Sequence, residues 1–68
     1  MLNTIKLSKV IKEKGLTVYA LAERVGVNKS TFFRKLKKGG EKFMLWEIES
    51  ITKHLELSKP EMLELFFM

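Results

Sequence analysis

Basic side chains are concentrated in the middle of the chain, where they could hold the phosphates of a nucleic acid. Residues 28–42 contain six Lys or Arg and one Glu, a net charge of +5. Residues 1–27 have a net charge of +3, and residues 43–68 have a net charge of −3. A basic stretch backed by a neutral or acidic half is typical of proteins that bind phosphate backbones. The alternative interpretation is a solvated charge run that only keeps the protein in solution.

The composition of the 68 residues gives little support for disulfides, metal sites or catalytic sites. Cysteine is absent and there is one histidine, which excludes disulfides and leaves too few ligands for a zinc site. No nucleophile stands beside a plausible base, and no glycine motif could cradle a phosphate. So short a chain does not easily enclose a substrate pocket. We therefore expect no enzyme, no cofactor and no metal site.

The apolar residues do not form a long continuous run. Lys6 and Lys9 interrupt the stretch from Met1 to Ile11, so we expect no signal peptide or membrane span there. We expect residues 1–68 to form a single domain in the cytoplasm.

Helical periodicity places the basic residues on the third of five predicted helices. Apolar residues recur at i, i+3 and i+4, and no alternation typical of a strand competes with this pattern. The sequence therefore predicts an all-α fold, a compact five-helix bundle. The predicted helices span about residues 4–14, 18–25, 29–37, 45–55 and 59–66.

Capping residues mark several of the helix ends. Gly15 and Gly26 follow the first two helices as glycines do after a helix C-terminus, and Asn28 is an N-cap residue type. Residues 58–61, Ser-Lys-Pro-Glu, have the pattern of a capping box with proline in the first turn.

The apolar positions of the last two helices predict which residues face the core. In the fourth helix these are Ile48, Ile51 and Leu55, and in the fifth they are Leu63 and Phe66.

The turn between the second and third helices indicates a helix-turn-helix. Gly26-Val27-Asn28 is short enough to hold two helices at roughly 90–120°. The small side chain of Ala22 permits close approach of the helices, and Val27 and Phe32 would fill the space between them. The second helix then positions the third, which would be the recognition helix.

Residues 16–32, LTVYALAERVGVNKSTF, resemble the Cro/cI-type helix-turn-helix family of phage repressors, also called the XRE family. The remainder is similar to a small Cro-like branch from phages and prophages of Gram-positive bacteria, in residues 34–36 (Arg-Lys-Leu), 47–48 (Glu-Ile) and 66–67 (Phe-Phe). The resemblance implies a lambda-repressor-like domain that binds operator DNA and regulates transcription as a repressor.

Two positions depart from the family pattern. Val18 stands where the family usually has a Gln that contacts phosphate and supports the recognition helix. Lys35 stands where an apolar residue is usual, and Leu36 is expected to pack in its place.

The resemblance also implies which residues contact DNA. The positions that read bases are Lys29, Ser30, Phe33 and Arg34. Their chemistry fits the major groove, because Lys and Arg suit guanine and an aromatic ring suits the thymine methyl group. Phe33 could instead belong to the core, and Lys29 could be merely solvated. The residues expected at phosphates are Thr17, Tyr19, Asn28, Thr31, Lys37, Lys38 and Lys42.

The apolar C-terminus suggests a partner surface. Since one recognition helix reads few base pairs, we expect a homodimer, at least on DNA. Its predicted interface residues are Leu65, Phe66, Phe67 and Met68. An alternative function is a protein-interaction module, an antirepressor or modulator that binds a larger phage repressor and has little DNA binding of its own.

Overall fold

The computed structural model describes residues 4–39 and 42–67, and these form helices with no strand. The helices are α1 (Thr4–Glu13), α2 (Val18–Val25), α3 (Lys29–Lys37), α4 (Leu45–His54) and α5 (Lys59–Phe66). This confirms the all-α prediction, and only α1 and α4 end one residue earlier than expected. No helix in the described ranges is both long and apolar enough to cross a lipid bilayer.

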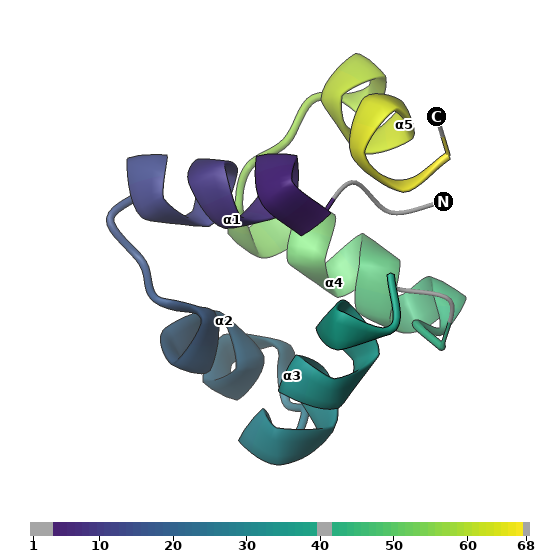
Figure 1. The fold of residues 1–68 in the computed structure, drawn as a ribbon. Helices are drawn as coiled ribbons and strands as arrows, with labels where there is room; N and C mark the ends of the chain where they lie inside the picture. Colours follow the sequence, from purple (N-terminus) through teal and green to yellow (C-terminus); the bar gives the residue numbers. More distant parts are fainter. Residues whose placement is uncertain (1–3, 40–41, 68) are drawn as a thin grey trace.

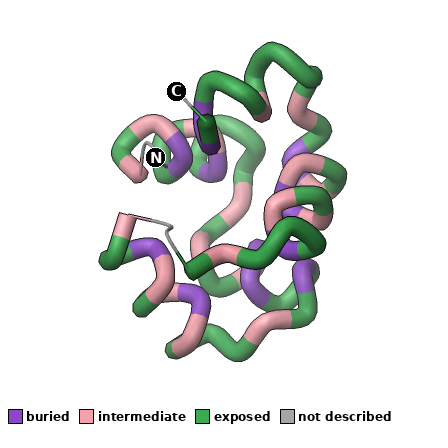
Figure 2. Tube along the Cα trace, turned by 90° about the vertical axis from the view of Figure 1, so that its right-hand side faces the viewer, coloured by how far each residue is buried: buried purple, intermediate pink, exposed green. Residues whose placement is uncertain are grey.

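Helix α4 runs through the middle of the molecule and separates its two ends (Figure 1). At one end α3 packs against α2, which itself packs on α4, and at the other end α1 packs against α5. An ion pair between Lys6 and Glu64 also joins α1 to α5. Buried positions lie on the inward sides of the helices, and the loops are largely exposed (Figure 2). The predicted recognition helix therefore lies at the end of the molecule away from α5.

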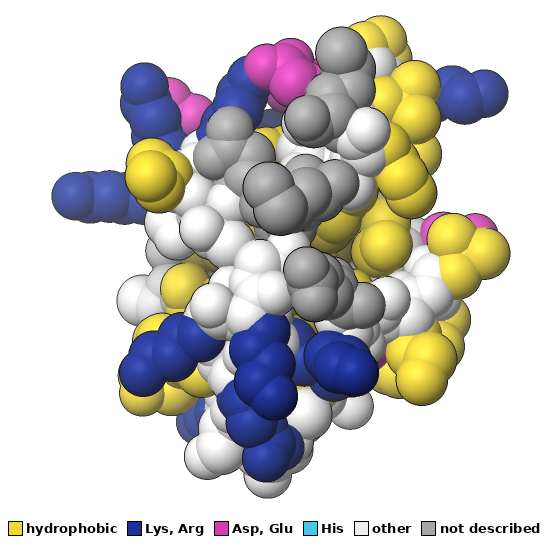
Figure 3. All heavy atoms as spheres, turned by 45° about the vertical axis from the view of Figure 1, so that its right-hand side comes forward, with side chains coloured by type: hydrophobic (Ala, Val, Ile, Leu, Met, Phe, Trp, Pro, Cys, Tyr) yellow, Lys and Arg dark blue, Asp and Glu magenta, His cyan; other side chains and the backbone are white. Residues whose placement is uncertain are grey.

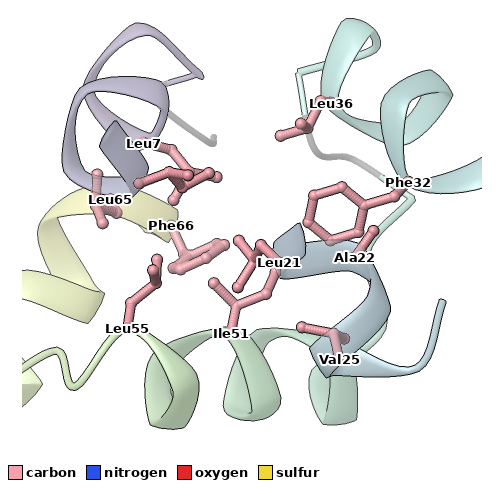
Figure 4. Close-up of a cluster of buried hydrophobic side chains, with 11 residues drawn as sticks. Leu7, Leu21, Ala22, Val25, Phe32, Leu36, Ile51, Leu55, Leu65 and Phe66 are labelled. Atoms are coloured by element: carbon pink, nitrogen blue, oxygen red, sulfur yellow. The ribbon is translucent and has the colours of Figure 1, made fainter. Parts of the chain in front are cut away.

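Every helix contributes to one hydrophobic core (Figure 4). Phe32 is fully buried and its ring points from α3 toward Ala22 of α2. The prediction that Leu63 faces inward is wrong, since its side chain is 41% exposed and Leu65 is buried instead. The prediction for Phe66 is confirmed, since this residue is buried beside Leu65. The buried hydrophobic residues are Leu7, Ile11, Leu21, Ala22, Val25, Phe32, Leu36, Ile51, Leu55, Leu65 and Phe66.

Left-handed residues follow four of the helices, and Gly39, with φ 73°, is the one that follows α3. Gly15 has φ 75° and follows α1, and Gly26 has φ 88° directly after α2, as the sequence predicts. Helix α4 lacks such a glycine, and Glu56 takes φ 52° two residues beyond its end. Glu56 takes this conformation although a β-carbon makes it less favourable than it is for glycine.

The predicted capping box begins α5. The Ser58 hydroxyl accepts the N–H of Glu61 at 3.3 Å, and the Ser58 N–H donates to the Glu61 carboxylate at 2.8 Å. The Ser58 backbone N–H above all, and next the Ser58 side chain, hold the pKa of the Glu61 carboxyl below its ordinary value. Leu57 and Met62 pack on the core on either side of the box, as a hydrophobic staple does.

Candidate nucleic-acid interface

A tight turn sets α2 and α3 at their crossing. The Gly26 N–H donates to the carbonyls of Ala22 and Glu23, and the Val27 N–H donates to Ala22. The Asn28 side chain then accepts the N–H groups of Ser30 at 2.9 Å and Thr31 at 3.2 Å. These bonds satisfy donors that a helix start leaves unpaired, so α3 begins at Lys29.

Helix α3 has a buried face and an exposed face. Phe32 and Leu36 are buried in the core. The exposed face carries Lys29, Ser30 and Arg34, which all lie in the first two thirds of the helix. The predicted base-reading residues therefore share an accessible surface, apart from the partly buried Phe33.

Phe33 lies outside the core in an aromatic pair that bridges the two helices. Its ring centroid is 5.2 Å from that of Tyr19 on α2, with the planes tilted by 51°. The Lys29 ammonium lies 5.9 Å from the centre of the Tyr19 ring, within the range of a cation–π contact. A hollow next to this pair is lined by Tyr19, Ser30, Phe33, Arg34 and Lys37. Tyr19 thus supports two of the predicted base-reading residues from α2.

The hydroxyl and amide groups predicted at phosphates lie near the start of α2 and α3. The Thr17 oxygen accepts the N–H of Ala20 at 3.0 Å, which leaves its hydroxyl proton available to donate. The Asn28 oxygen is used in the cap, so its amide nitrogen is the group that can donate to a phosphate. Thr31 accepts a bond of 3.3 Å from the Arg34 guanidinium and holds that side chain along the helix.

Lysines extend the exposed face beyond the end of α3. Lys37, Lys38 and Lys42 are all exposed. In Figure 3, Lys and Arg side chains gather at the lower end of the molecule, where α3 lies in Figure 1. We refer to Lys29, Arg34, Lys37, Lys38 and Lys42 as the basic face. Gly40 and Glu41 lie outside the described residues.

The two departures from the family pattern have different structural outcomes. Val18 is half-buried and packs on the core, so it offers no polar group to DNA. Lys35 is partly buried, with its ammonium 2.8 Å from both carboxylate oxygens of Glu47. Leu36 takes the buried position beside it, as expected.

The predicted C-terminal dimer surface needs correction. Leu65 and Phe66 are 1% and 6% exposed and belong to the core of the single chain, so their side chains cannot form an exposed partner surface. They face inward because they lie three and four residues after Met62, on the same side of α5. Phe67 is 56% exposed, and Met68 lies outside the described residues.

Two features were missed at the sequence level. Glu47 is buried on the inward side of α4, and its position four residues before Ile51 on the apolar stripe could have revealed it. Three exposed apolar residues stand at the start of α4, Met44, Leu45 and Trp46. Of these, Leu45 lines a groove together with Phe67. No sequence pattern marks this groove, since it depends on how α4 and α5 pack.

Comparison with known protein families gives a match over most of the chain. The family model described as Cro/C1-type HTH DNA-binding domain matches residues 6–66. No curated protein and no solved structure matches the chain.

Proposed function

The chain belongs to the Cro/C1-type helix-turn-helix DNA-binding family, and we propose that it is a Cro-like repressor of phage or prophage origin. It binds an operator that overlaps a promoter, blocks transcription and helps to set a choice between lysis and lysogeny. The exposed side of α3, with its basic residues and its capped N-terminus, is the observation that carries this proposal.

The proposed mechanism divides the basic face into two parts. The N-terminal half of α3 enters the major groove, where Lys29 and Arg34 donate to guanine and Ser30 bonds a base edge. Phe33, held against Tyr19, lies close enough to the surface to contact a thymine methyl group. Lys37, Lys38 and Lys42 follow the phosphates and fix the register without reading sequence.

Lys29→Ala and Arg34→Ala test the base-reading role. Each bidentate base contact is worth about 1–3 kcal/mol, so each variant is expected to bind its operator roughly 5- to 150-fold more weakly per half-site. The measurement is fluorescence anisotropy with duplex DNA from the region upstream of the protein's own gene. Affinity for random-sequence DNA of the same length should fall less, since phosphate contacts dominate there.

Lys9→Ala is the matched control, because Lys9 is exposed on α1, away from α3. It should bind the operator as the parent does. If Lys29→Ala and Arg34→Ala also bind as tightly and selectively as the parent, the assignment of α3 as the base-reading element fails.

We propose further that two copies bind adjacent half-sites about 34 Å apart, because one helix reads too few base pairs. The corrected contact surface is the groove between α4 and α5, a hollow of about 400 Å³. The apolar lining of this groove consists of Leu45, Ile48, Leu57, Met62 and Phe67. Hydrophobic side chains also collect along the right-hand side of the molecule in Figure 3.

Phe67→Glu tests this dimer by sedimentation velocity. Burying a phenylalanine contributes about 1.5–3 kcal/mol, so its removal from each copy should raise the dimer dissociation constant roughly tenfold or more. Ile5→Glu provides the control, since Ile5 is exposed on α1 and does not line the groove. Equal dimerisation of parent and Phe67→Glu would exclude Phe67 from the interface.

A protein-interaction module is the second candidate function, favoured by the exposed Met44, Leu45 and Trp46 and by the apolar Val18. In that case the chain binds a larger repressor and modulates it. Specific DNA sites normally have dissociation constants far below micromolar at moderate salt. If the parent binds no upstream DNA with a dissociation constant below about micromolar under these conditions, this second function replaces the first.

A further inference from the structure

Glu47 is the one buried polar or charged side chain among the described residues, with 1% exposure. Its two oxygens each lie 2.8 Å from the Lys35 ammonium. One of them also accepts the N–H of Met44 at 2.7 Å. A carboxylate is costly to bury without such partners, and an ion pair of this kind seldom adds stability over an apolar pair. Glu47 thus caps the start of α4, and its pairing with Lys35 calls for a role besides stability.

The pair joins two segments that otherwise have little direct contact. Lys35 lies in the last turn of α3 and Glu47 in the first turn of α4. Helix α3 packs closely on α2 rather than on α4. The loop between α3 and α4 carries Lys38 and Lys42 of the basic face. The ion pair therefore closes this basic loop at its base.

Phe43 adds a second attachment at the same place. The Lys35 ammonium lies 5.9 Å from the centre of the Phe43 ring, and that ring meets the buried Phe32 ring at 5.3 Å, edge to face. The Lys35 side chain, 19% exposed, is thus fixed toward α4 by a carboxylate and an aromatic ring. We refer to Lys35, Phe43 and Glu47 as the clamp.

We propose that Glu47 is a positioning residue for DNA recognition and acts through Lys35. This proposal rests on the proposed function of α3. Successive residues of an α-helix are about 100° apart around its axis. With Lys35 held inward, the preceding residue Arg34 is directed to the exposed side. The side chains of a binding site must be held within about 0.5 Å of the positions in which they contact the ligand. The clamp supplies that restraint at the end of α3.

The double variant Lys35→Met/Glu47→Met tests the clamp without leaving a buried charge unpaired. Apolar replacement of a buried ion pair is often neutral or stabilising. The Met44 N–H loses its acceptor in this variant, so we expect the variant to fold and to melt slightly below the parental temperature. Its selectivity is expected to fall about tenfold, as when one bidentate bond to a base is removed. Selectivity is the ratio of the dissociation constants for a random duplex and for the duplex that the parent selects from a random pool.

Lys37→Met is the matched control on the same helix. Lys37 is exposed and belongs to the basic face, so its replacement should weaken binding to both duplexes alike and leave selectivity unchanged. A double variant that is fully folded and keeps parental selectivity would overturn the positioning role.

Amide hydrogen exchange tests the clamp in the absence of DNA. The Lys38 N–H donates to Arg34 at the end of α3, and the Gly26 N–H donates to Ala22 at the end of α2. In the double variant the Lys38 amide should exchange about tenfold faster, a change equivalent to the weakening of one hydrogen bond. The exchange rate of the Gly26 amide should stay as in the parent. Unchanged exchange at Lys38 would overturn the clamp. If the parent selects no sequence, the proposed function fails, and exchange at Lys38 alone decides whether the clamp holds α3.

Discussion

Raising the salt concentration from 50 to 200 mM is expected to weaken operator binding by about 10³–10⁵-fold, if a dimer neutralises about six to ten phosphates. Three exposed lysines in each copy, Lys37, Lys38 and Lys42, are assigned to phosphates, which gives six in a dimer, the lower end of that range. Binding to them releases condensed counterions, and this release is less favourable at higher salt. Lys35 is not counted, because its ammonium is held by Glu47.

The measurement is the slope of log K against log salt concentration, from anisotropy titrations at several concentrations. Lys37→Gln/Lys38→Gln should flatten the slope by roughly 0.9 for each phosphate that the variant no longer neutralises. Lys9→Gln removes a charge from α1 and should leave the slope as in the parent. A double variant with the parental slope would mean that these lysines do not contact phosphates.

Phe32→Ala is expected to lower the free energy of unfolding by about 3–5 kcal/mol, as large aromatic truncations in cores do. The ring is fully buried between α2 and α3 and also meets Phe43. Small domains have total stabilities toward the low end of about 5–15 kcal/mol, so much of the variant should be unfolded at room temperature. The DNA-binding surface would disappear with the fold.

Phe33→Ala is the matched control, the same truncation one residue later on the half-buried side of α3. It should reduce stability by about 1 kcal/mol, the scale of an aromatic pair at a surface. Urea denaturation followed by circular dichroism gives both values. Equal destabilisation by the two variants would contradict the division of α3 into a buried and an exposed face.

The sequence predicts the helices well because local signals mark most of their ends. Gly15 and Gly26 take the left-handed conformation, and Asn28 and Ser58 cap the helices that follow them. These signals act over three or four residues and need no knowledge of the tertiary fold.

Predictions that depend on packing between helices succeed less often. Leu63 and Leu65 are equally apolar, and only the orientation of α5 against α1 decides which of them is buried. The pairing of Lys35 with Glu47 likewise spans two helices and a loop. For the candidate site, periodicity separates the exposed residues of α3 from Phe32, but the contact of Phe33 with Tyr19 requires the crossing of α2 and α3.

The separation of the two faces of α3 has a consequence for how this regulator can diverge. Lys29, Ser30 and Arg34 contribute nothing to the hydrophobic core, which takes only Phe32 and Leu36 from this helix. Exposed substitutions away from caps and networks usually change stability by less than about 0.5 kcal/mol. New operator preferences can therefore arise at these three positions by single substitutions, with no compensating change elsewhere in the scaffold.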